Sequence, residues 1–135
     1  MKKGMFRFVL AAMALVLATV ACNFSSSTAN IRDAYMARDE AGTDRTTVFA
    51  QQDVFYCIVE VANAPEDTTV KAVWTAVNVE NTEPNTLIDE YELTTTDAIL
   101  PFNLVNSQGL WPPGTYKVEI YLNGTLDRTL DFEVQ

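Results

Sequence analysis

Hydrophobic residues in most of this chain recur at every second position, and no window keeps the 3.6-residue spacing of an amphipathic helix. Turn-forming residues interrupt the alternation at intervals of about ten residues. Alternation of this kind places successive side chains on opposite faces of a strand. Short strands at this spacing are typical of a sandwich or a barrel. The sequence therefore predicts an all-β fold, which we place in residues 31–135.

The C-terminal segment carries the clearest pattern. Residues 115–122 and 125–134 both alternate, and Asn123-Gly124 lies between them. Asn-Gly between two such runs is the strongest short hairpin signal, because a type I′ turn needs a positive φ at both central residues. We predict a hairpin that buries one face of each strand. The buried residues are expected to be Tyr116, Val118, Ile120, Leu122, Leu126, Leu130, Phe132 and Val134.

The rest of the domain contains further strands, for a total of seven or eight. The remaining alternating or β-branched runs are residues 31–37, 46–49, 54–61, 70–79, 86–93 and 98–105. Pro101 interrupts the last of these runs and so predicts an edge strand or a bulge. The residues expected to face the core on the two strongest strands are Phe55, Cys57, Val59, Val61, Val70, Ala72, Trp74 and Ala76.

Three of these residues resemble the characteristic core residues of an immunoglobulin-like fold. Cys57, Trp74 and Tyr116 follow one another in the order of the strand-B cysteine, the strand-C tryptophan and the corner tyrosine. Val118 stands where antibody-type domains have their second cysteine, so the inter-sheet disulfide is absent. The sequence is more similar to bacterial immunoglobulin-like or fibronectin-III-like modules. The resemblance implies an antiparallel β-sandwich and no particular function.

Charge and composition exclude several classes of function. The 135 residues include 18 acidic and 9 basic ones, which gives a net charge of −9. A nucleic-acid partner is not expected, because binding to phosphates needs clustered Lys and Arg. The chain contains no histidine, which excludes Ser-His-Asp and Cys-His catalysis within it. Two cysteines are too few for a cysteine zinc site, and we expect neither a metal nor another cofactor.

The N-terminal residues 1–21 differ in composition from the rest. Lys2, Lys3 and Arg7 precede an uncharged stretch over residues 8–20. That stretch would span roughly 20 Å as a helix, too short for a bilayer core of about 30 Å. A basic start, an apolar middle and small residues at the end are the order of a secretory signal peptide. We therefore expect residues 1–21 to be an export signal.

The end of this segment, Leu17-Ala18-Thr19-Val20-Ala21-Cys22, resembles the lipobox of bacterial lipoproteins. The resemblance implies that Cys22 is acylated after cleavage and attaches the protein to a membrane, with residues 22–30 as a flexible tether. Cleavage would leave six basic residues against 18 acidic ones, for a net charge of −12. The expected location is extracytoplasmic. That means the outer membrane or cell surface of a diderm, or the outer face of a monoderm plasma membrane.

Two features of the domain are candidate binding sites. Trp111, in the sequence Trp-Pro-Pro-Gly, either stacks on a ligand from an exposed loop or plugs the end of the sandwich, and the plug is favoured. The acidic group Asp89, Glu90 and Glu92 either forms a site or is a solvated surface, and the surface is favoured. Cys57 lies on an apolar strand without a neighbouring base, so we expect a buried thiol and not a nucleophile.

These observations favour a non-catalytic, membrane-anchored immunoglobulin-like module that binds an envelope or extracellular protein or a glycan. The alternative is a structural or assembly subunit of an envelope complex. In that case outer rows, such as the one containing Ile58 and the one containing Val77 and Val79, would pack against another chain. A hydrolase that uses carboxylates alone, or an inhibitor, is a weaker alternative, because no pair of acids has a spacing that supports it.

Overall fold

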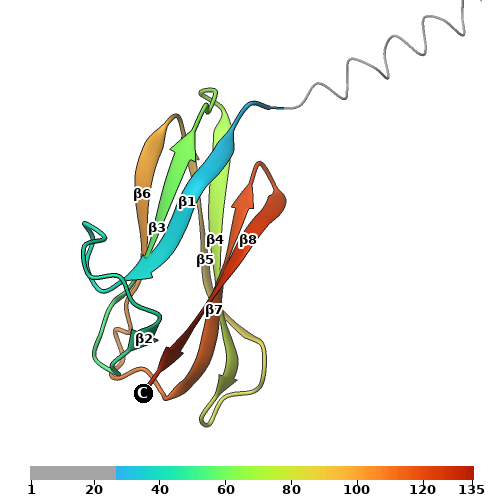
Figure 1. The fold of residues 1–135 in the computed structure, drawn as a ribbon. Coiled ribbons are helices and arrows are strands. Elements are labelled where there is room, and N and C mark those ends of the chain that lie inside the picture. The colour runs from blue at the N-terminus through green and yellow to red at the C-terminus, as the bar shows by residue number, and fades with distance from the viewer. Residues whose placement is uncertain (1–26) are drawn as a thin grey trace, which may run out of the picture.

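A computed structural model of the protein describes residues 27–135, and every regular element in this part of the chain is a strand (Figure 1). The predicted signal peptide and Cys22 lie outside the described residues. No helix in residues 27–135 is long and apolar enough to cross a membrane. The strands are β1 (Asn30–Ala37), β2 (Val48–Phe49), β3 (Phe55–Ala62), β4 (Thr68–Val79), β5 (Thr86–Thr95), β6 (Ala98–Leu104), β7 (Gly114–Leu122) and β8 (Thr125–Val134).

The eight strands form two sheets packed face to face. The small sheet has the order β1-β3-β6, and the large sheet has the order β2-β8-β7-β4-β5. All neighbours are antiparallel except β2, which runs parallel to β8. In immunoglobulin terms the small sheet holds strands A, B and E, and the large sheet holds G, F and C. The fold is therefore the immunoglobulin-like β-sandwich that the sequence predicts.

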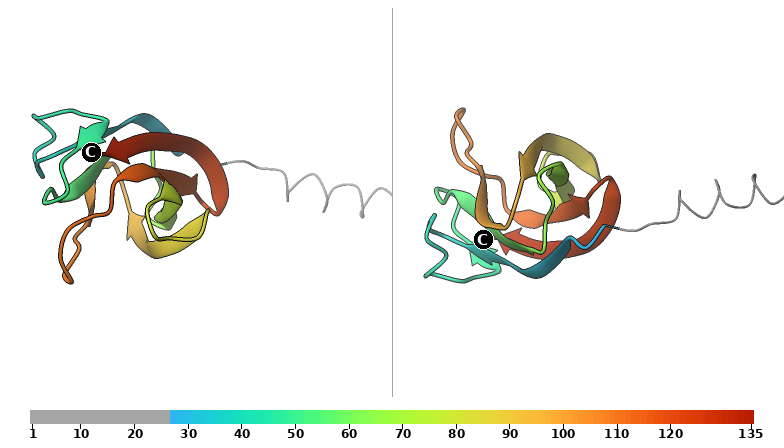
Figure 2. Two further views of the ribbon diagram at one scale, coloured as in Figure 1. Left: turned by 90° about the horizontal axis from the view of Figure 1, so that it is seen from below. Right: turned by 90° about the horizontal axis from the view of Figure 1, so that it is seen from above.

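The fifth strand distinguishes this sandwich from the antibody constant domain. There the strand after C pairs with E and extends the first sheet. Here β5 pairs with β4 instead, so the small sheet ends at β6 and leaves the inner side of β5 without a facing strand. Both end-on views in Figure 2 place β5 and the loop after β6 on the same side of the molecule. We call this the open side of the sandwich.

The predicted core faces are buried. All eight residues predicted to face inward on β3 and β4 belong to one core. Six aromatic rings lie among them and contact each other edge-on or stacked, with centroids 4.5–6.1 Å apart. They belong to Phe49, Phe55, Trp74, Trp111, Tyr116 and Phe132.

The last hairpin has the predicted turn but a different register near its tip. Asn123 and Gly124 have φ values of 49° and 82°, as a type I′ turn requires. A bulge between Ile120 and Tyr121 shifts the pairing, so that Leu126 lies opposite Tyr121. The prediction that Leu126 faces the core is therefore wrong, and its side chain is exposed. Arg128 reaches across to β1 and donates a hydrogen bond of 2.8 Å to the carbonyl of Ile31.

Two glycines should respond differently to replacement by alanine. At Gly114, where φ is 150°, an added Cβ would meet the carbonyl of Asn78 and lie 2.6 Å from the Cα of Val79. At Gly124 an added Cβ meets open space, and only the positive φ opposes it. We expect Gly114→Ala to lower the free energy of unfolding by about 3 kcal/mol and Gly124→Ala by about 1 kcal/mol. Urea denaturation of both variants checks this order, and equal losses would contradict it.

Candidate functional site

Trp111 is fixed in the wall of the sandwich by contacts far away in the sequence. Its ring stacks on Phe55 with centroids 4.5 Å apart, and its indole N–H donates a 3.1 Å hydrogen bond to the carbonyl of Asp53. Its backbone N–H donates a hydrogen bond to the carbonyl of Gln51. The side-chain amide of Gln51 donates a second hydrogen bond to the carbonyl of Trp111. Only 7% of Trp111 is exposed. Trp111 is thus not an exposed stacking platform, since the segment between β2 and β3 covers it.

Tyr116 forms a corner next to Trp111. Its hydroxyl donates a hydrogen bond of 2.6 Å to the carbonyl of Pro112, four residues earlier. The bond closes the chain between the loop after β6 and the start of β7, in the manner of the tyrosine corner of immunoglobulin domains. The indole N–H of Trp111 and the hydroxyl of Tyr116 therefore both donate hydrogen bonds to backbone carbonyls of the chain.

Cys57, Trp74 and Val118 lie in the core. Cys57 is a free thiol, fully buried, and burial raises its pKa to about 12. A thiol with such a pKa is not ionised at neutral pH and is not a nucleophile. Val118, which stands where antibody-type domains have their second cysteine, is also fully buried.

The three predicted acidic residues of β5 do not converge. Asp89 lies opposite Trp74, whose side chain faces inward, and Asp89 therefore points toward the open side. Glu90 and Glu92 lie opposite Val73 and Lys71 on the outer face of the sheet. In the part of the chain that the structure describes, no three acidic or cysteine side chains are grouped closely enough to hold a metal ion. The acidic group is thus divided between two faces of one strand.

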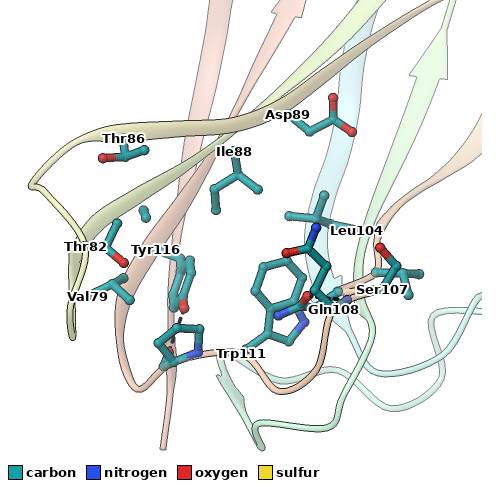
Figure 3. A pocket seen from close by; sticks show the side chains of 14 residues that line it. Val79, Thr82, Thr86, Ile88, Asp89, Leu104, Ser107, Gln108, Trp111 and Tyr116 are labelled. Atoms are coloured by element: carbon teal, nitrogen blue, oxygen red, sulfur yellow. Dashed lines mark hydrogen bonds between the residues drawn. The ribbon is translucent and has the colours of Figure 1, made fainter.

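Asp89 does share a hollow with Trp111. A cavity of about 460 Å³ opens between β5, the end of β6 and the loop after it. Trp111, Tyr116 and Leu104 line its inner wall, and Ile88 points into it from β5 (Figure 3). Polar side chains at its rim include Thr82, Ser107, Gln108 and Asp89. A second hollow of about 320 Å³ adjoins it along β5, and its lining contains Asp89, Tyr91, Leu93 and Phe102.

These two hollows, which share Asp89, form a groove that we call the open-side groove. Sequence reasoning missed it, because it depends on β5 joining the large sheet while the small sheet ends at β6. One signal was present in the sequence. Tyr91 is an aromatic residue within an acidic strand, and it lines the second hollow and is 60% exposed.

The two outer rows considered for assembly are less exposed than the sequence suggests. Ile58 is buried, because Gly42 of the loop after β1 lies against it. Val79 turns into the core beneath Gly114, since a bulge in β4 changes its register. Val73 and Val77 are half-buried. The outer face of the large sheet therefore lacks the continuous exposed apolar row that the assembly interpretation requires.

Comparison with known proteins identifies the fold and no family. No family model matches the sequence, and no curated protein matches it. Among solved structures, the alkylpurine DNA glycosylase AlkC of Pseudomonas fluorescens, bound to DNA containing an abasic site analogue, matches with a TM-score of 0.54 and 13% identity. The match covers 82% of this chain and 31% of that one.

Two further solved structures are similar to this chain. A mutant β-glucosidase from Listeria innocua in complex with laminaribiose matches with a TM-score of 0.51 and 12% identity, over 83% of this chain and 17% of that one. An immunoglobulin-like protein from Pseudomonas aeruginosa has a TM-score of 0.48 and 12% identity, over 82% of this chain and 99% of that one. This chain spans less than a third of the glycosylase and of the β-glucosidase, and the likeness to them is one of fold alone.

Removing the hydroxyl of Tyr116 should destabilise the domain measurably. Tyr116→Phe leaves the carbonyl of Pro112 without its donor, so we expect the free energy of unfolding to fall by about 1 kcal/mol. Tyr121→Phe is the matched control, because Tyr121 is half-buried and its ring contact with Lys71 survives the change. Urea denaturation at pH 7 measures both variants. Equal effects would contradict a structural role for the Tyr116 hydrogen bond.

The buried thiol should make stability fall at alkaline pH. The pKa of Cys57 is about 12 in the folded chain, whereas the ordinary value is 9.0. Its contribution is complete below pH 9 and is lost as the pH rises toward 12, because the unfolded chain gives up the proton first. By pH 10.5 this loss is on the order of 2 kcal/mol. Cys57→Ala should therefore show a shallower decline than the unmodified chain in urea denaturation between pH 8 and 10.5, and parallel declines would contradict this account.

Proposed function

We propose that this protein is an extracytoplasmic lipoprotein, anchored by an acylated Cys22, whose non-catalytic immunoglobulin-like module binds an envelope or extracellular protein or glycan. The anchoring half of the proposal rests on the basic, apolar and small-residue order of residues 1–21 and on the lipobox-like sequence before Cys22. The binding half rests on one structural observation, which is the open-side groove beside Trp111, with an aromatic and aliphatic inner wall and a polar rim. The domain would then be held at a membrane while its groove meets the partner.

The geometry of the domain suits such an arrangement. The described chain begins beside the turn between β3 and β4, where Thr28 donates to the carbonyl of Asn63. The larger hollow is at the other end of β4, beside Val79. A strand rises about 3.3 Å per residue, so the 12 residues of β4 separate the two by roughly 35 Å. The larger hollow therefore lies at the end of the domain far from the first described residues, where a lipid attached before residue 27 leaves it accessible.

We propose, as part of this function, that the module is not catalytic, and the placement of its thiol and acids supports this. The only described thiol is buried, and Asp89 lies on the opposite face of β5 from Glu90 and Glu92. A carboxylate-only hydrolase needs two acids facing one substrate across a set gap. The groove contains Asp89 and no other acid in the lining of either hollow. This arrangement supports binding in preference to acid–base chemistry.

Replacing the lipid attachment residue should release the protein from the membrane. We expect Cys22→Ser to abolish incorporation of a labelled fatty acid and to move the chain from the membrane fraction to the soluble fraction of bacterial cells expressing it. Cys57→Ser is the matched control, since it removes the other cysteine and should leave labelling unchanged. Fractionation and fatty-acid labelling measure this outcome. Continued labelling of the Cys22→Ser chain would contradict the anchor.

A further inference from the structure

Two strongly exposed apolar side chains line the open-side groove. Tyr91 lines the second hollow and Val105 the first, and they are 60% and 58% exposed. Leu87 and Ile99 are exposed too, but they lie opposite Thr75 and Glu60 on the outer faces of the two sheets. Exposed apolar residues that line a hollow mark an interaction surface.

The same side of the molecule is strongly acidic. The linings of the two hollows contain no Lys and no Arg, and Asp89 belongs to both. The turn between β4 and β5 also carries Glu80 and Glu83, and neither is within 4.0 Å of a basic group in the described chain, whereas Glu90 and Glu92 lie on the outer face of β5. An anionic ligand is therefore disfavoured in the groove, and a cationic one is favoured.

The buried aromatic residues of the groove offer little to a sugar, and Tyr91 is its exposed aromatic side chain. A sugar usually stacks on an open aromatic face, but one face of Trp111 is covered by Phe55. The indole N–H and the Tyr116 hydroxyl already donate to carbonyls of the chain. A second copy of this chain is disfavoured too, because a symmetric contact would bring Asp89 and its acidic neighbours against their own counterparts.

We propose that the open-side groove docks an extended segment of a partner protein whose groove-facing side chains, at every second residue, are alternately apolar and Lys or Arg, with one cationic head paired to Asp89. In an extended segment every second side chain points the same way, about 6.6 Å apart. Two adjoining hollows that share one carboxylate suit such a spacing, with an apolar wall for the aliphatic stem and Asp89 for the head. This assignment rests on the proposed function and narrows its partner from protein or glycan to a basic, extended protein segment.

Three labelled peptides of nine residues test this assignment with the full chain in detergent micelles. All three have Ser at the even positions, so that the odd positions share one face; on that face the first alternates Val and Lys, the second alternates Val and Glu, and the third alternates Ser and Lys. Fluorescence anisotropy measures each Kd at physiological salt. We expect the Val-Lys peptide to bind at least about tenfold more tightly than either of the others. Equal binding of the Ser-Lys peptide would overturn the groove, because the attraction would then depend on net charge alone.

Two variants and one control locate the binding. Asp89→Asn should weaken binding of the Val-Lys peptide about fivefold, the upper end for an exposed ion pair. Tyr91→Ser should weaken it by about tenfold through loss of apolar contact, and its exposed position makes misfolding avoidable. Glu66→Gln is the control, because it removes one charge at the far end of β4, in the turn before it. Thermal denaturation confirms that all three variants are folded.

The outcomes separate this assignment from the proposed function. If Asp89→Asn and Glu66→Gln weaken peptide binding equally, or if Tyr91→Ser has no effect, the groove assignment is overturned. Binding of laminarin or chitin oligosaccharides that Tyr91→Ser weakens would also overturn it, while leaving a lipid-anchored binding module in place. Loss of fatty-acid labelling in the unmodified chain would instead overturn the anchor and leave the groove assignment standing.

Discussion

The packing of Phe55 against its aromatic neighbours is the interaction on which the rest of the structure depends. Phe55 begins β3 and contacts Phe49, Trp111, Tyr116 and Phe132 with centroids 4.5–5.7 Å apart. These residues come from β2, the loop after β6, β7 and β8, so one ring joins both sheets and the loop that closes the end of the sandwich. Burial of several aromatic side chains, at about 150–250 Å² each, supplies the core that this domain builds without a disulfide.

The sequence predicts the strands and their faces well, because both depend on local alternation. The inward residues of β3 and β4 and the turn at Asn123-Gly124 follow from neighbouring positions alone. The sequence does not predict where Leu126 points, since a bulge at Asp127 of the same strand decides it. Trp111 is held by Gln51 and Asp53, about sixty positions away, and the open-side groove depends on which sheet β5 joins. Those outcomes depend on contacts between distant segments, which no local pattern contains.

The charge of the domain and its open side can be understood together. The free edges of sheets invite pairing with other chains, and proteins protect them with charges, prolines and bulges. Here β6 carries Pro101, and β5 carries Asp89, Glu90, Glu92 and a bulge opposite Trp74. The acids keep identical copies apart while leaving apolar side chains accessible. On the groove assignment proposed above, one set of residues would both oppose self-association and favour a partner of opposite charge.

The position of the last strand governs when this domain can form. In the large sheet β8 lies between β2 and β7, and the backbone N–H groups of Glu133 and Gln135 donate to the carbonyls of Thr47 and Phe49. A chain that emerges from its N-terminus first must therefore release β2 long before its only pairing strand in the large sheet arrives. Such long-range pairing folds slowly. Until β8 has been synthesised, Phe49 and Phe55 of the earlier strands lack their contacts with the ring of Phe132.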